Sequence, residues 1–320
     1  MIGLRAIASY IPPGRLSNYA RREEFDLSDD FIRGKLGVEQ VSRLAPGEET
    51  STLCVNALTA LQGRMKLDPA AVECLIVCTQ NPDGHGIPHT SAVVHGAIGA
   101  SDECAAFDIG LGCSGYVYGL SVATSFMEAN RMTRGLLFTA DPYSKILDPS
   151  DKNTVLLFGD AATVTLLEEG LPGDGAWYPT RFVFATRGKD GQALSNASGR
   201  LHMNGRAVFT FSATAVPPQV EALLAQAGMT KKDVDFFLLH QGSRYVVETL
   251  MKRLALPASK VPCHLAEQGN TVSSSVPLLL ERYFAGGGQG RILLSGFGVG
   301  LSWASCLLER RPGAPSPSAR

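Results

Sequence analysis

One cysteine lies in a sequence pattern that could make it a nucleophile. Cys113 is the fourth residue of the string GLGCSG, residues 110–115, which stands between a short apolar run and a helical pattern. A strand-to-helix turn of this kind puts the cysteine near a helix N-terminus, where the helix dipole favours an anion and lowers the pKa of a thiol. The backbone N–H of Cys113 could also help to bind an oxyanion.

The same string fits two other structures. It matches G-x-G-x-x-G, the dinucleotide-binding fingerprint, and Asp141 follows the next apolar run, about where an acid would bind a ribose. A plain glycine turn beside a buried cysteine would give the same letters. The string alone therefore leaves a nucleophile, a dinucleotide site and a structural turn open.

Three further segments carry polar residues at positions where chemistry is common. His240, in the string HQG, ends an apolar run, and the carboxyl end of a buried strand faces the crevice where α/β proteins bind ligands. Asn270 lies in GNT, residues 269–271, which by itself is an ordinary turn before a helix. The loop GFGVG, residues 296–300, offers backbone donors, including Val299, that could complete an oxyanion hole.

The elements that must position these residues alternate along the chain. Short apolar runs rich in branched residues predict buried strands at 74–79, 105–109, 135–140, 162–167, 236–240, 291–295 and 304–308. Helical patterns lie between them at 50–66, 90–98, 115–129, 216–227, 244–254 and 274–285. This alternation predicts an α/β protein with helices layered on a sheet.

The two halves of the chain resemble each other. AVECLIVCTQ (71–80) is similar to DVDFFLLHQ (233–241), GLLFTA (135–140) to RILLSG (291–296), and GDAATVTLLE (159–168) to GLSWASCLLE (300–309). Three matches in the same order predict a duplicated α/β unit. We expect a first half at 1–172, a second half at 173–310, and a disordered Pro/Ser-rich tail at 311–320.

Composition excludes several classes of protein. The chain has 320 residues, of which 45% are hydrophobic, so it can bury a substantial core and long disorder is excluded. Its 29 basic and 30 acidic side chains give a net charge of −1, which provides no electrostatic footprint for nucleic acid or an anionic membrane. Because no apolar run is long enough to span a bilayer and the opening stretch lacks signal-peptide features, we expect a cytoplasmic protein.

The other candidate metal ligands and thiols form no motif. The seven cysteines contain no C-x-x-C pair, and five of them lie in apolar runs, which is typical of small buried hydrophobes. His85, His89 and His95 lie close together, but no carboxylate or second cluster joins them. The sequence therefore predicts no metal site.

Taken together, the four glycine- and polar-rich segments resemble β-ketoacyl-ACP synthase III of the thiolase superfamily. LSDDFI (27–32) is similar to the family's T-S-D-E-W-I, and residues 106–115 to its A-F-D-x-x-x-x-C-S-G. LDPSD (147–151) and FGDAA (158–162) are similar to its D-x-x-D and F-G-D-G-A segments. This shared order displaces the dinucleotide hypothesis and implies a thiolase-like fold, in which two duplicated α/β halves form αβαβα layers.

The resemblance also implies a mechanism. Cys113 would accept an acyl group from a thioester, with the oxyanion held by the N–H groups of Cys113 and Val299. His240 and Asn270 would donate hydrogen bonds to the oxygen of a malonyl thioester carried by acyl carrier protein, as decarboxylation turns it into an enolate. The substrates are then thioesters of coenzyme A or phosphopantetheine, and no metal or redox cofactor is expected.

The sequence departs from the family pattern at residues expected to bind substrate. Phe31 stands where tryptophan is usual, and Lys35 and Lys152 stand where arginines help to hold coenzyme A. Lysine lacks the planar bidentate contact of arginine, which weakens the case for coenzyme A as the acyl donor and leaves room for a carrier-protein donor. Ser243 replaces an asparagine that organises active-site water, and Val299 replaces a glycine, which requires a φ that valine tolerates. These departures predict a specialised relative of the housekeeping enzyme.

Three more expectations come from the resemblance. Ile87 would reach the acyl pocket of a second copy in a homodimer and gate acyl length, and Phe297 in the last loop would contact substrate. Arg244, Lys252 and Arg253 would form a basic patch for an acidic acyl carrier protein.

Other functions remain to be compared with condensation. The same scaffold could transfer an acyl group to an oxygen or nitrogen nucleophile without decarboxylation, or the chain could be a non-catalytic partner subunit. A dehydrogenase remains only through the G-x-G-x-x-G match. Retention of Cys113, His240 and Asn270 argues against a non-catalytic chain, and Asn270 favours condensation, because simple acyl transfer does not require two enolate donors.

Overall fold

The computed structural model describes residues 1–170, 175–196, 199–284 and 290–310. Its strands are β1 (Ile2–Tyr10), β2 (Gly14–Ser17), β3 (Gln40–Arg43), β4 (Cys74–Cys78), β5 (Ala105–Ile109), β6 (Arg134–Ala140), β7 (Ala162–Glu169), β8 (Trp177–Thr186), β9 (Leu194–Ser195), β10 (His202–Met203), β11 (Phe236–Leu239), β12 (Gly290–Gly298) and β13 (Ser302–Arg310). Its α-helices are α1 (Arg22–Phe25), α2 (Thr50–Gln62), α3 (Thr90–Ile98), α4 (Gly115–Ala129), α5 (Lys152–Val155), α6 (Gly205–Gln226), α7 (Arg244–Arg253) and α8 (Ser275–Phe284). Short 3₁₀ or π turns cover Phe31–Leu36, Pro69–Ala71, Tyr143–Lys145, Gly188–Ala193, Lys231–Asp233, Ala258–Lys260 and Val272–Ser274.

One large sheet contains two copies of the same strand pattern. Among the described residues it has nine strands in the order β11-β12-β13-β8-β1-β7-β6-β4-β5. In one half β4 is parallel to β6, β6 is antiparallel to β7, and β7 is antiparallel to β1; the other half repeats this with β11, β12, β13 and β8. The halves meet through the single pair Leu4–Trp177. The predicted duplication is therefore confirmed in the fold, with β5 as an additional edge strand.

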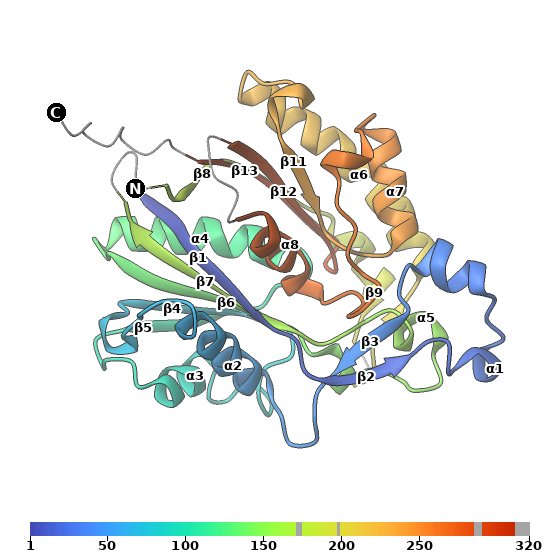
Figure 1. The fold of residues 1–320 in the computed structure, drawn as a ribbon, viewed down its shortest axis with the longest axis horizontal. Coiled ribbons are helices and arrows are strands. Elements are labelled where there is room, and N and C mark those ends of the chain that lie inside the picture. The colour runs from blue at the N-terminus through green and yellow to red at the C-terminus, as the bar shows by residue number, and fades with distance from the viewer. Residues whose placement is uncertain (171–174, 197–198, 285–289, 311–320) are drawn as a thin grey trace.

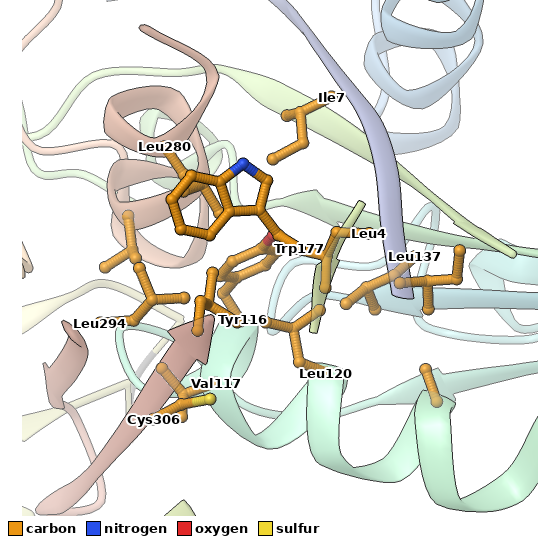
Figure 2. Packing of buried hydrophobic residues seen from close by; sticks show 14 of the residues in the cluster. Leu4, Ile7, Tyr116, Val117, Leu120, Leu137, Trp177, Leu280, Leu294 and Cys306 are labelled. Atoms are coloured by element: carbon orange, nitrogen blue, oxygen red, sulfur yellow. The ribbon is translucent and has the colours of Figure 1, made fainter. Parts of the chain in front are cut away.

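Two helices lie between the halves of the sheet and form the central layer (Figure 1). Both α4 and α8 contact strands of both halves. Their shared core contains Leu4 and Leu137 from the first half, Tyr116 and Leu280 from the two helices, and Leu294 from the second half (Figure 2). Two more apolar clusters pack α2 and α3 on the outer face of the first half, and α6 and α7 on that of the second. These clusters give the predicted αβαβα order of layers.

The described elements correct several sequence-based boundaries. Helix α6 begins at Gly205, not at residue 216, and continues through Pro217 and Pro218. Its start is capped by Asn204, whose side chain accepts the Ala207 N–H, and burial of its apolar face stabilises it despite the prolines. The central strands β1 and β8 were not predicted, because arginine, proline and serine interrupt their apolar residues. The predicted end of the last helix at Ala285 lies outside the described residues.

Two other expectations concern residues at the edges of the described ranges. The division between residues 172 and 173 remains a proposal, because residues 171–174 lie outside the described part of the chain, as does the tail 311–320.

No helix in the ranges that the structure covers has the length and apolarity needed to cross a bilayer.

Candidate active site

Cys113 lies in the tight connection between β5 and α4. The Gly115 N–H donates to the Gly112 carbonyl at 2.7 Å, which closes the turn, and Cys113 directly precedes Ser114, the N-cap of α4. A Cβ on Gly112 would lie 2.5 Å from Gln80 Oε1 and 2.7 Å from a Val299 methyl carbon. The close packing around the cysteine therefore favours glycine at this position, and the predicted strand–turn–helix is confirmed.

The electrostatic setting of Cys113 differs from the one that we predicted. The residue is only 3% exposed. Burial raises the pKa of its thiol to about 12, while a hydrogen bond from the Val299 N–H acts in the opposite direction. The prediction of a lowered pKa was wrong, because the position at a helix N-terminus could be read from the sequence but the loss of solvent could not.

The last glycine loop closes against the sulfur of Cys113. Gly298 and Gly300 have φ angles of 158° and 130°, whereas Val299 between them is not among the non-glycine residues with positive φ. Valine is therefore tolerated, because the glycines adopt the unusual torsions. A Cβ on Gly298 would lie 2.6 Å from Cys113 Sγ, so only glycine allows this approach.

His240 follows β11 and is 2% exposed. Its backbone N–H donates to the Ser295 carbonyl at 2.8 Å, and its ring packs edge-to-face on Phe297 at 5.3 Å. Nδ1 lies 2.6 Å from Ser275 Oγ. Burial lowers the pKa of His240 to about 3, so the ring is neutral at physiological pH.

Asn270 is fixed by two loops that pack tightly. Its N–H donates to the Leu157 carbonyl at 2.8 Å, and its own carbonyl accepts the Gly159 N–H at 3.0 Å. Its side-chain Oδ1 accepts the Val272 N–H at 2.9 Å, which orients the amide. Gly269 has a φ of 79°, and a Cβ there would lie 2.5 Å from the Leu157 carbonyl oxygen. The amide nitrogen is thus left free to act as a donor.

These three residues line one cavity of about 340 Å³. They come from separate segments, after β5, after β11 and before α8, and the fold brings them together. Apolar side chains form most of the wall, and exposed Lys35, Lys152 and Arg206 also line it. The apolar lining residues are Phe31, Leu36, Leu157, Phe158, Leu194, Met203, Val208, Phe209, Val246 and Phe297.

The predicted substrate-binding residues fall into two groups. Phe31, Lys35, Lys152, Phe297 and Ser243 all line this cavity. Ser243 also caps α7 by accepting the Val246 N–H. Ile87 lies elsewhere, in the loop between β4 and α3, where it is 92% exposed. It contributes nothing to the cavity of its own chain.

The predicted carrier-protein residues are not contiguous. Arg244 is the first residue of α7, is half-buried against Gly37, and has a buried Nε without a hydrogen-bond partner. Lys252 and Arg253 are exposed at the other end of the helix, which at 1.5 Å per residue places them about 12 Å along the axis. The structure separates Arg244 from the other two cations.

The competing ribose hypothesis fails at Asp141. This residue is fully buried, its Oδ1 accepts the Gln80 N–H at 2.6 Å, and burial raises its pKa to about 6. It cannot reach a ligand in a crevice. Among the described residues no group of three or more His, Cys, Asp or Glu side chains could hold a metal ion.

Sequence reasoning missed Ser275, Arg206 and Tyr245. Ser275 contacts His240 across a separation of 35 residues, and Arg206 and Tyr245 line the cavity from α6 and α7. The only sequence signal for Ser275 is the run of three serines, residues 273–275, at the start of a predicted helix.

Two family models and several curated relatives match this chain. Residues 107–188 match the family model for 3-oxoacyl-[acyl-carrier-protein (ACP)] synthase III, and residues 224–310 match the model for its C terminal. A β-ketoacyl-[acyl-carrier-protein] synthase III of Streptococcus equi subsp. zooepidemicus is 33% identical over 322 residues, which cover 95% of this chain and 97% of the relative. One from Lactococcus lactis is 32% identical over 324 residues with the same coverage.

A solved structure gives the same result for the fold. The β-ketoacyl-ACP synthase III of Thermus thermophilus superposes with a TM-score of 0.89 at 30% identity, over 98% of this chain and 100% of that one. Sequence and fold therefore agree, and this chain belongs to the 3-oxoacyl-[acyl-carrier-protein] synthase III family of thiolase-fold acyltransferases.

Proposed function

We propose that this protein transfers an acyl group from a thioester to Cys113 and then condenses it with a malonyl thioester on acyl carrier protein, with loss of carbon dioxide. One observation carries the proposal: a buried thiol, a neutral imidazole and an oriented amide line the same cavity. A thiol supports acylation by itself. The two extra donors are what decarboxylation to an enolate requires, so they favour condensation over simple acyl transfer.

In the first step the sulfur of Cys113 attacks the thioester carbonyl, and the oxyanion accepts hydrogen bonds from the N–H groups of Cys113 and Val299. The new C–S bond forms as the donor's C–S bond breaks. The proton of Cys113 leaves with the departing sulfur as a neutral thiol. Because the thiol starts protonated, with a pKa of about 12, the buried cavity gains no net charge in this step.

In the second step the bond between the malonyl carboxylate and its α-carbon breaks, and the electron pair forms an enolate. His240 and Asn270 donate hydrogen bonds to the enolate oxygen, and neutral His240 keeps its proton. The α-carbon then attacks the acyl group, a C–C bond replaces the C–S bond, and the Cys113 thiolate takes up one proton. This chemistry calls for no metal or redox group, since the thioesters supply the activation.

We propose that phosphopantetheine enters past Phe31, Lys35 and Lys152. Each of them lines the cavity, and the two lysines are exposed, which supports contact with the phosphate of coenzyme A or of a carrier protein. We assign the donor to a carrier protein and the chain to a specialised pathway, on the strength of these three departures from the family pattern. Lys252 and Arg253, with Arg244 apart from them, are the proposed carrier contacts.

We propose a homodimer built on the edge of the sheet at β5. Every residue of β5 is only partly buried, although the strand carries Phe107 and Ile109. Ile87, Val122 and Phe184 are exposed large apolar side chains. A second copy would cover such a surface and put Ile87 against the acyl cavity of the other chain. All seven cysteines are free, which supports a reducing, cytoplasmic setting.

The test measures intact mass after incubation with a panel of acyl-CoAs and acyl-carrier proteins. We expect one acyl adduct on the wild type and none on Cys113→Ala. Addition of malonyl-carrier protein should then release carbon dioxide and a β-keto product. Absence of an adduct with every donor would overturn the acylation step, and acyl transfer without consumption of malonyl thioester would replace condensation with the acyltransferase alternative.

A further inference from the structure

Within the described ranges, Ser275 alone makes a side-chain hydrogen bond to the ring of His240. It begins α8 and is 3% exposed. Its Oγ lies 2.6 Å from His240 Nδ1, and both atoms are buried. Neither the sequence pattern nor the mechanism proposed above assigns this hydroxyl a role.

A neutral imidazole carries one N–H and one lone pair, and the contact to one nitrogen decides which nitrogen holds the proton. Burial keeps His240 neutral, with its pKa lowered to about 3. Two tautomers are therefore available. With the proton on Nε2, the cavity side of the ring donates a hydrogen bond; with the proton on Nδ1, the same side presents a lone pair.

The backbone around Ser275 favours one of these tautomers. The Gln241 N–H points at Ser275 Oγ from 3.5 Å, so the oxygen has a donor on that side. Gln241 is itself held in place, because its Nε2 donates to the Leu239 carbonyl at 2.8 Å and its Oε1 accepts the His264 N–H at 2.9 Å. Because Ser275 Oγ already accepts the Gln241 N–H, its own hydrogen is best directed to an acceptor. The lone pair on Nδ1 of His240 is that acceptor.

We propose that Ser275 is a positioning residue that donates its hydroxyl hydrogen to Nδ1 of His240 and so keeps the ring proton on Nε2, the nitrogen left to serve the cavity that Cys113 and Asn270 also line. The inference rests on the proposed condensation, whose second step needs His240 as a donor. In the other tautomer a nitrogen lone pair would face the enolate oxygen, and the repulsion would replace a stabilising hydrogen bond at the point where charge develops.

The surroundings of Ser275 determine which variants can test this. A space of about 10 Å³ lies beside it, lined by Gln241, Gln268 and Thr271 among others. That volume is close to one water molecule, so a water could replace the hydroxyl in Ser275→Ala. Ser275→Thr and Ser275→Val are the better pair, because threonine and valine have nearly the same shape and differ in the hydroxyl.

Ser274→Ala is the matched control. Ser274 is also fully buried, and its Oγ donates to the Thr139 and Ala161 carbonyls and not to His240. The Ser274→Ala substitution removes a hydroxyl from the neighbouring residue, so it measures the general cost of losing a buried hydroxyl.

The experiment combines ¹⁵N NMR of histidine-labelled protein with separate assays of the two steps. The His240 signals are assigned by their loss in His240→Gln. We expect the Nε2–H tautomer in the wild type and Ser275→Thr, and the Nδ1–H or a mixed tautomer in Ser275→Val. For Ser275→Val, kcat for carbon dioxide release from malonyl-carrier protein should fall at least tenfold relative to Ser275→Thr, with KM unchanged and Cys113 acylation within twofold.

Three outcomes would overturn the proposal: an Nδ1–H tautomer in the wild type, an Nε2–H tautomer in folded Ser275→Val, or equal loss of carbon dioxide release in Ser275→Val and Ser274→Ala. If Ser275→Val does not fold, the wild-type tautomer decides the question: an Nε2–H ring supports the proposal and an Nδ1–H ring overturns it. If the wild type releases no carbon dioxide, the proposed function fails, while the tautomer comparison still tests Ser275.

Discussion

The two halves of the sheet have the same strand order but supply different parts of the site. Thr79 and His240 occupy equivalent positions, directly after β4 and β11, at the end of the matching segments CTQ and LHQ. Thr79 Oγ1 accepts the Asn81 N–H and supports a loop, whereas His240 lines the cavity. The first half instead provides Cys113 after its extra strand β5.

The two halves differ in the connections between their strands. The strands and the helices packed on them are repeated, but the connections at the carboxyl ends of the strands are not. The proposed nucleophile comes from the first half, and both proposed enolate donors come from the second. Each half can therefore be perturbed separately, and the two proposed steps should respond differently.

The largest difference between the halves is expected for Asn270→Ala. Loss of one of two enolate donors should lower carbon dioxide release about 10²–10³-fold. Acylation of Cys113 should stay within about threefold, because its oxyanion is held by backbone N–H groups. Rapid-quench mass measurement checks acylation and a radiochemical assay checks decarboxylation. Asn153→Ala, at an exposed residue that lines the same cavity, is the control. Equal losses of acylation and of carbon dioxide release in Asn270→Ala would contradict the division of labour.

The buried ionisable groups of the two halves should give opposite pH dependence of stability. Asp141 in the first half has its pKa raised from 3.8 to about 6, so the stability it provides below pH 4 is lost as pH rises through about 6, a change of about 3 kcal/mol. His240 has its pKa lowered from 6.5 to about 3. The stability that the neutral ring contributes is therefore lost as pH falls from 6.5 towards 3.

Urea denaturation from pH 3.5 to 7.5 measures this. Relative to Asp141→Asn, the wild type should lose unfolding free energy as pH rises; relative to His240→Gln, it should gain. A parallel pH profile for the wild type and Asp141→Asn would show that the carboxyl of Asp141 is ionised without cost in the folded protein.

Gly298→Ala should impair both steps, because it acts across the boundary between the halves. The new methyl would lie 2.6 Å from Cys113 Sγ and displace either the sulfur or the loop that carries Val299. We expect acylation to fall about 10²-fold, the size of effect that a displacement near 1 Å causes. Gly188→Ala is the control, since its Cβ would meet no atom within 4 Å. Wild-type acylation by folded Gly298→Ala would show that the loop has room to move.

The smallest effect is expected at the proposed carrier contacts. Charges at the rim of an interface mainly affect association, so Lys252→Ala combined with Arg253→Ala should raise KM for malonyl-carrier protein about two- to fivefold, and less at high salt. Steady-state kinetics at two ionic strengths measure this, with exposed Lys66→Ala as the control. A change in kcat at constant KM would place the carrier elsewhere.

The sequence was sufficient to predict what depends on local patterns. The turn around Cys113, most strand positions and the duplicated order could be read from apolar runs and glycines. Strands β1 and β8 were missed because arginine, proline and serine interrupt them. The raised pKa of Cys113 and the contact between Ser275 and His240 depend on burial and on long-range packing, which no local pattern reports.

The placement of α4 between the two halves has a consequence for synthesis of the chain. Its apolar residues, such as Tyr116 and Leu120, pack in a cluster that also contains Ile292 and Leu308 from the last two strands. A ribosome-bound chain ending before β12 therefore leaves one side of α4 uncovered. Complete burial of α4 therefore waits for nearly the whole chain, and until then its uncovered apolar side chains are available for aggregation or for binding to a chaperone.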